Sequence, residues 1–180
     1  MNPERTAFLC EESKIQIVPK IDEPTLRLIS GDVGPLEAGI PVMVPLWMAV
    51  QLRRKNHCTV VMPPWMSTDQ LKRFVADESD SETLVALPKY FFEITRILVK
   101  DAKEDILEAD QIKHLIHDLW DKREAKIRSS ALKFISQSEA SYARMDNVQD
   151  AEVSSASLRA TLSASAKIAQ FVDLTHELTM

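Results

Sequence analysis

The chain has 180 residues, a formal net charge of −5 and two cysteines, Cys10 and Cys58. This length allows one domain or two small ones. The acidic charge argues against a general nucleic-acid-binding protein, which usually carries a basic domain. The two cysteines form neither a disulfide framework nor a CxxC pair, so we expect reduced thiols in an intracellular compartment. No apolar run approaches the roughly 18 residues of a membrane span, and we expect no membrane association.

Residues 1–62 predict a small β-rich domain. Pro3–Glu12 can form a short helix, because proline suits the first helical turn. Lys14–Ile21 alternates apolar and polar residues, the pattern of a half-buried strand. Thr25–Ser30 follows a turn and predicts the second strand of a hairpin-like pair.

The stretch Gly31–Trp65 contains all three glycines of the chain and most of its prolines. Glycine permits positive φ angles and proline fixes φ, so this composition predicts a rigid backbone shape. We expect an elbow between the β-rich module and a helical module, with a short helix over Pro45–Lys55 and a β-prone run over His57–Met62. The residues expected to shape this elbow are Gly31, Gly34, Pro35, Pro41, Pro45, Trp47 and Trp65.

Residues 63–180 predict a helical domain. Ser67 or Thr68 can cap a helix that runs to about residue 76, and Asp77–Glu82 is expected to be a solvated acidic loop. After Pro88 the chain contains neither glycine nor proline, which favours long helices. We expect a helix over about 89–102 and long helices near 108–140 and 147–172. The fold class is thus α+β, mostly α.

The helix near 108–140 carries apolar residues at steps of three and four, which form one continuous stripe. If it is helical throughout, it spans roughly 50 Å, more than a compact domain of this size needs. We therefore expect another subunit to bury the stripe. The predicted interface residues are Ile112, Leu115, Leu119, Trp120, Arg123, Ile127 and Phe134.

No motif for catalysis, a metal or a cofactor is found. His114 and His117 lie near aspartates but lack the further ligands of a metal site. The glycines do not match a phosphate-binding loop. Phosphorylation of Ser79 or Ser81 is conceivable, but a plain exposed linker is favoured. The residues alone thus predict a non-enzymatic, helix-rich assembly subunit.

Two basic clusters leave two interpretations open: the first is Arg53–Lys55 with His57, and the second is Lys122, Arg123, Lys126 and Arg128. Their cations could face DNA phosphates in an assembly. Alternatively, the first cluster complements a helix C-terminus, and the second pairs with Asp118, Asp121 and Glu124. The second alternative is favoured for both. The candidate DNA-facing residues are Arg53, Arg54, Lys55, Lys126 and Arg128.

Three segments in order resemble the eukaryotic GINS complex, specifically its Psf-type subunit two. They are GDVGP at Gly31–Pro35, PVMVPLWMAVQL to PPWM at Pro41–Met66, and DLWDKREAKIR at Asp118–Arg128. Each segment alone is a weak match, whereas the long middle segment is specific. Residues before Tyr90 are less proline-rich than the family pattern, and the tail after Val172 matches none of it.

The resemblance implies a small β domain followed by a larger helical domain, with no cofactor. It also implies a heterotetramer with the Sld-five-type subunit and the Psf one- and three-type subunits. That complex would join the MCM ring and its Cdc-type cofactor, in the nucleus, to form the active replicative DNA helicase of initiation and elongation. ATP hydrolysis would belong to MCM, and direct nucleic-acid binding by this chain would be weak or absent. The alternatives are a helix-rich protein–protein adaptor unrelated to replication and a direct nucleic-acid binder.

Overall fold

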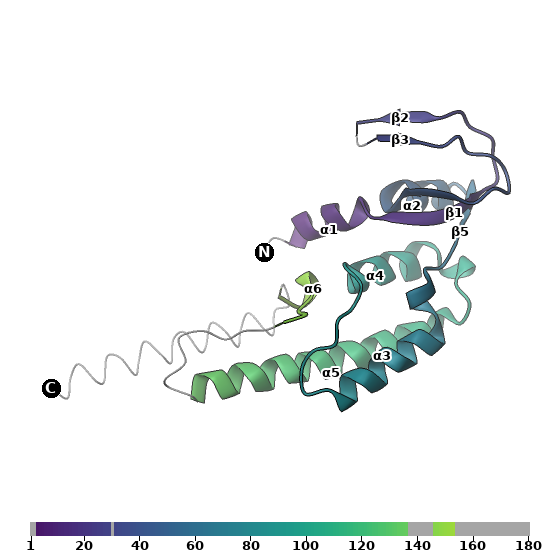
Figure 1. The fold of residues 1–180 in the computed structure, drawn as a ribbon. Coiled ribbons are helices and arrows are strands. Elements are labelled where there is room, and N and C mark those ends of the chain that lie inside the picture. The colour runs from purple at the N-terminus through teal and green to yellow at the C-terminus, as the bar shows by residue number, and fades with distance from the viewer. Residues whose placement is uncertain (1–2, 30, 137–145, 154–180) are drawn as a thin grey trace.

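The structure is a computed structural model that describes residues 3–29, 31–136 and 146–153. It has an antiparallel β portion near the N-terminus and helices after it, which confirms the α+β, mostly α prediction (Figure 1). The described elements in chain order are α1 (Pro3–Glu11), β1 (Lys14–Pro19), β2 (Leu26–Leu28), β3 (Gly31–Val33), β4 (Val42–Pro45), α2 (Leu46–Arg54), β5 (Cys58–Val60), the 3₁₀ helix η1 (Pro64–Met66), α3 (Thr68–Asp80), α4 (Phe91–Asp101), the 3₁₀ helix η2 (Lys103–Asp105), α5 (Ala109–Ser136) and α6 (Asp150–Val153).

Strand β1 is the centre of a three-stranded antiparallel sheet with the order β4–β1–β5. Ile15 pairs with Val44, and Ile17 pairs with Val42 on one side and Val60 on the other. Ile15 and Ile17 are both buried, as the alternation of apolar and polar residues predicts. Helix α2 packs against all three strands of this sheet.

The predicted pairing of the first two strands is wrong. Strand β2 pairs with β3 to form a separate ribbon, in which Leu26 faces Val33 (Figure 1). Both hydrogen-bonding edges of β1 are occupied by β4 and β5, whose Val44 and Val60 are buried. Leu26 and Leu28 are only half-buried. The sheet therefore recruits the strands that bury more apolar surface, although they lie further along the chain.

The elbow prediction for Gly31–Trp65 also needs correction. This stretch supplies β3, β4, α2 and β5, so it builds much of the β portion instead of linking it to the helices. Gly31 (φ 125°) lies at the turn of the β2–β3 ribbon, and Gly34 (φ 101°) precedes Pro35 in a cis peptide bond. At Gly34 an added Cβ would lie 3.1 Å from the backbone nitrogen of Leu36. Gly31 thus shapes a hairpin turn, Pro41 precedes β4, and Pro45 is the last residue of that strand.

Helix α3 begins after Ser67, whose hydroxyl accepts a hydrogen bond from the backbone of Gln70, as predicted for an N-cap. It continues to Asp80, so the predicted acidic loop is wrong over Asp77–Asp80, which form the last turn of the helix. The reason is a buried ion pair of Glu78, described below. Helices α3 and α5 lie side by side along much of their length (Figure 1).

Helix α5 ends at Ser136 within the described residues, close to the predicted helix over 108–140, whose last four residues lie outside them. Of the predicted helix over 147–172, only α6 lies within the described residues. At 28 residues, α5 is roughly 42 Å long.

A chain of aromatic rings connects the core of the two parts. Trp65 contacts Phe91 with ring centroids 5.1 Å apart, Phe91 contacts Phe92 at 5.1 Å, and Phe92 meets Trp120 edge-on at 4.8 Å. Edge-on pairs of this kind contribute beyond their buried area. The hydrophobic core therefore runs without a break from the sheet to α5.

Candidate protein-interaction surfaces

The first basic cluster lies where α2 meets the helical part of the molecule. Arg53 donates from Nε to Asp105 at 2.6 Å and from Nη2 to Glu104 at 2.7 Å. Arg54 pairs with Asp101 at 2.8 Å. These carboxylates raise the pKa of Arg53 further above its ordinary value. Arg53 and Arg54 therefore join α2 to the region of η2, and they are not free to face DNA as a cluster.

The second basic cluster is also paired within the chain. Lys126 contacts Glu78 Oε1 at 2.8 Å, and Arg128 pairs with Glu124 one turn away at 3.0 Å. The predicted pairing is thus confirmed for Glu124, whereas the main partner of Lys126 lies on α3, far away in sequence. Lys55 is exposed and has no ion pair within the described residues.

Arg123, predicted as an interface residue, is the centre of a buried group of ion pairs. Its side chain is 0% exposed. Its Nε donates to Glu152 at 2.5 Å and its Nη2 to the other Glu152 oxygen at 3.0 Å. Its Nη1 donates to Glu78 at 3.0 Å and to the Val85 carbonyl at 2.8 Å, and Nη2 also donates to the Asn147 carbonyl at 2.8 Å. All five guanidinium donors are therefore used.

This network joins α5 to two stretches of chain that are distant from it in sequence. Glu78 lies in the last turn of α3 and Val85 in the following loop, whereas Asn147 precedes α6 and Glu152 belongs to α6. With Lys126 added, two cations face two carboxylates, so the buried charges balance. Balanced charge and full hydrogen bonding are the conditions under which buried ions are tolerated.

Most of the predicted interface stripe is the core of this chain itself. Ile112 and Leu119 are 0% exposed and Ile127 is 2% exposed, and α3 and α4 pack against α5. These three residues and Arg123 cannot contact a partner directly, which corrects the prediction. Leu115 and Trp120 are half-buried, and the side chain of Phe134 lies outside the described residues. The periodicity identified the apolar face correctly but could not say which chain covers it.

A groove of about 990 Å³ lies between α4 and α5. Phe92, Ile97 and Val99 line it from α4, and Ile116 and Trp120 line it from α5. Thr6 and Ala7 of α1 and Ala151 of α6 also line it, and α1 contacts both α4 and α6 (Figure 1). Apolar residues on the facing sides of two adjacent helices form a surface that an amphipathic helix can fill.

The charges of this groove are divided between its rim and one end. Arg96 and Lys100 on α4 and Lys113 on α5 are exposed and have no ion pair within the described part of the chain, and His117 lies beside them. Glu93 lies near α6. Both of its carboxylate oxygens are buried, and neither accepts a hydrogen bond of normal geometry from the described residues. Burial raises the pKa of Glu93, and the nearby Asp150 and Glu152 raise it further.

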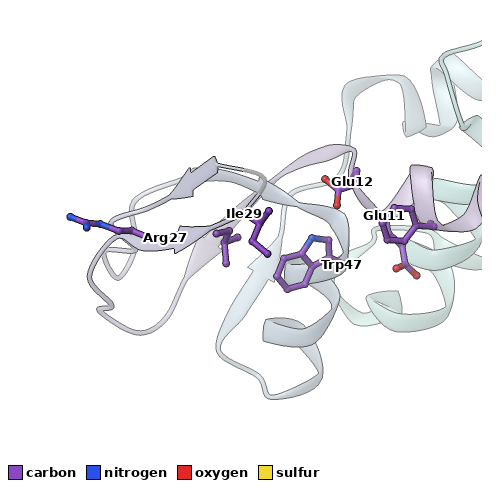
Figure 2. A pocket seen from close by; sticks show the side chains of 7 residues that line it. Glu11, Glu12, Arg27, Ile29 and Trp47 are labelled. Carbon is purple, nitrogen blue, oxygen red and sulfur yellow. The ribbon is translucent and has the colours of Figure 1, made fainter.

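The second hollow lies between α1, α2 and the β2–β3 ribbon and measures about 540 Å³. Figure 2 shows the Ile29 side chain beside the Trp47 ring, with Glu11 and Glu12 on the side of α1 and Arg27 directed away. Ile29 is fully exposed and Phe8, which also lines the hollow, is 64% exposed. Trp47, predicted to shape an elbow, thus lies at a surface of the β portion.

Within the described residues, no group of three or more histidine, cysteine or acidic side chains could hold a metal ion. Burial raises the pKa of the Cys10 thiol to about 12 and that of Cys58 to about 11, so both stay protonated and unreactive at neutral pH. None of the described helices is long and apolar enough to cross a membrane.

Together, the fold and its surfaces define a class: a small β portion joined to a helical bundle, with an open apolar groove and an ordered internal ion-pair network. Comparison with known proteins agrees. Residues 2–61 match the family model "PSF2 N-terminal domain", and residues 65–162 match "GINS complex protein helical bundle domain". The chain belongs to the PSF2 family of GINS complex proteins.

Named relatives cover nearly all of the chain or most of it. A "Probable DNA replication complex GINS protein PSF2" from Caenorhabditis elegans is 46% identical over 180 residues, 99% of each chain. The "DNA replication complex GINS protein PSF2" of Homo sapiens is 37% identical over 154 residues, 85% of this chain and 83% of the relative. The Schizosaccharomyces pombe protein of that name is 30% identical over 128 residues, 71% and 70% of the two chains.

Proposed function

We propose that this chain is the PSF2-type, non-catalytic subunit of a heterotetrameric GINS complex in the nucleus. Its partners are the Sld-five-type and the Psf one- and three-type subunits. In this role the complex is a scaffold that joins the MCM ring and its Cdc-type cofactor to form the active replicative DNA helicase. Residues 1–62 and 63–180 act as its two domains.

The observation that carries this proposal is the open groove between α4 and α5 in a chain of this family. Trp120 and Ile116 leave apolar surface unfilled there, and an apolar groove between two helices is a surface on which an amphipathic helix can dock. Family membership directs that surface toward GINS subunits, because the relatives' names place them in the GINS complex. Of the predicted interface residues, we retain Leu115, Trp120 and Phe134.

Direct binding to DNA is not favoured. Four of the five candidate DNA-facing residues, Arg53, Arg54, Lys126 and Arg128, are engaged with carboxylates of the same chain. A cation that already has a close partner releases fewer counterions on meeting a phosphate, so it adds little affinity. We expect weak or no duplex binding by the isolated chain at physiological salt.

Co-expression tests the proposal. The tagged full chain is produced with the three other GINS subunits of its own organism, and the mass of the purified complex is measured. We expect one copy of each subunit. A homodimer refutes GINS assembly and supports an adaptor unrelated to replication. Recovery of the chain alone, when the three partners are expressed and soluble, has the same meaning. A complex that forms but fails to associate with MCM and the Cdc-type cofactor refutes the scaffold role alone.

A further inference from the structure

The α4–α5 groove has a charge pattern that specifies its occupant more closely than its apolar floor does. Arg96, Lys100 and Lys113, which have no ion pair among the described residues, stand on both sides of the floor. Asp110, which also lines the groove, is neutralised by Lys103 at 2.8 Å. The remaining acidic groups are Glu11 on α1 and Glu93 near α6. Most of the groove is thus bordered by positive charge, whereas its α1–α6 end is negative.

Glu93 is a second, independent indication that the groove is incomplete. A buried carboxylate without a hydrogen bond costs free energy, and native proteins rarely leave one unpaired. Neither Glu93 oxygen has a well-formed hydrogen bond within the described residues; the backbone amides of Glu93 and Ala151 lie near the carboxylate and offset its burial only in part. A partner that places a hydrogen-bond donor beside Glu93 removes this cost. A cationic donor there therefore adds to the binding free energy that burial of the apolar floor supplies.

Building on the proposed GINS assembly, we propose that the groove binds an amphipathic helix of another subunit, of defined charge pattern. Its apolar stripe rests on Phe92, Ile116 and Trp120. Asp or Glu residues border that stripe and face Arg96, Lys100 and Lys113. One Arg or Lys lies at the end near α1 and α6 and hydrogen-bonds Glu93.

The charges of the groove argue against two other occupants, a later segment of this chain and a second copy of it. Residues 154–172 of this chain follow α6 and contain Arg159 and Lys167 but no acidic residue. Such a segment could offer a cation to Glu93, but it has no acidic residue to face Arg96, Lys100 and Lys113. A second copy docked through the same groove would also oppose its own cations, and like charges across an interface cost several kcal/mol. An acidic helix from a different subunit avoids both conflicts.

Charge reversal in the co-expressed complex tests the rim. In Arg96→Glu/Lys113→Glu, two attractive contacts become repulsive, and we expect about 100-fold weaker binding, seen as loss of at least one subunit. The matched control is Lys72→Glu/Arg73→Glu, which changes the net charge equally on exposed α3 positions outside the groove. The complex should tolerate it. Equal losses in both variants, or intact assembly of the groove variant, overturn the proposal.

A photocrosslinker identifies the occupant. With p-benzoylphenylalanine at position 116 in the otherwise wild-type complex, we expect a crosslink to a helix of another subunit with acidic residues beside its apolar stripe. A crosslink to residues 154–180, to a second copy, or to a basic segment overturns the proposal. If wild-type chain and partners form no complex at all, the proposed function itself fails, which this design distinguishes.

The pairing with Glu93 has its own readout. Glu93→Gln removes the charge and keeps the shape, so we expect about tenfold weaker binding of the crosslinked subunit. The isolated full chain should meanwhile become more resistant to urea, because an unpaired charge has been removed. A purely structural role of Glu93 predicts the opposite change in the isolated chain. Unchanged affinity refutes the contact with a cation.

Discussion

Arg123→Met is the substitution that should damage the fold most. It removes the partner of two carboxylates, Glu78 and Glu152, whose side chains are 0% and 4% exposed. Lys126 still faces Glu78, so one carboxylate keeps a cation, but Glu152 loses both of its charge-assisted bonds. Breaking a buried pair in this way costs about 3–5 kcal/mol. We therefore expect the free energy of unfolding to fall by about 4 kcal/mol.

Two further variants separate charge from hydrogen bonding. Arg123→Lys keeps the charge but offers three donors in place of five, so at least two acceptors lose their bonds. At about 1 kcal/mol for each lost bond, we expect a loss of about 2 kcal/mol. Arg128→Met is the matched control, because its partner Glu124 lies one turn away at the surface. Exposed pairs of this type contribute less than about 1 kcal/mol.

The assay is urea denaturation of the dilute full chain, followed by far-ultraviolet circular dichroism. The transition midpoint should move while its slope stays constant, which indicates a change of stability in a similar unfolding reaction. The triple variant Arg123→Met/Glu78→Leu/Glu152→Leu removes the three charges that are at most 4% exposed, and it leaves Lys126, which at 21% exposure can reach solvent. It should therefore recover most of the loss. If the triple variant is no more stable than Arg123→Met, uncompensated charge is not the cause, and the reasoning is refuted.

Three other perturbations follow from the structure. Folding raises the pKa of Glu93 above its ordinary 4.5, so its stabilising protonated form is lost as pH rises. Glu93→Gln should therefore stabilise the isolated chain by about 1 kcal/mol at pH 7 and have no effect below about pH 4, and equal effects at both pH values would contradict this sign. Asp105→Asn should lower the free energy of unfolding by about 2 kcal/mol, because Asp105 accepts hydrogen bonds from the Arg53 guanidinium at 2.6 Å and from the Val60 amide at 2.9 Å. Amide hydrogen exchange should then increase at β5 and η2. An increase confined to the β2–β3 ribbon would refute this prediction. The buried Cys10 and Cys58 should both resist a thiol-titrating disulfide reagent at pH 8 until urea is added, and rapid reaction in the folded chain would show that their thiols are accessible.

The sequence was sufficient for the parts of the fold that local patterns determine. Alternation located β1, the N-cap at Ser67 located the start of α3, and the absence of glycine and proline located α5. It was insufficient for strand pairing, because β1 selects its neighbours by buried area and not by proximity in sequence. The glycines were also misassigned, since positive φ angles are required equally by a hairpin turn and by a hinge.

The same limit applies to the interaction surfaces, where local patterns predict which face of a helix is buried but not which part of which chain buries it. Helical periodicity predicted that one face of α5 is buried, and Ile112 and Leu119 are buried. It could not reveal that α3 and α4 of the same chain bury that face. Glu78 was placed in a solvated loop because its neighbours in sequence are acidic, yet its partner Arg123 is 45 residues away. Long-range ion pairs leave no local pattern, so the network and the groove were missed.

The buried network and the groove are physically linked through α6. Arg123 holds Glu152 on α6, and the adjacent Ala151 lines the groove end where Glu93 lies. The network therefore sets the position of a wall that the partner helix must meet. Loss of Arg123 should weaken both folding and assembly, whereas loss of the Glu93 charge should strengthen folding and weaken assembly. These opposite signs separate a residue that builds the groove from one whose unpaired charge awaits a partner.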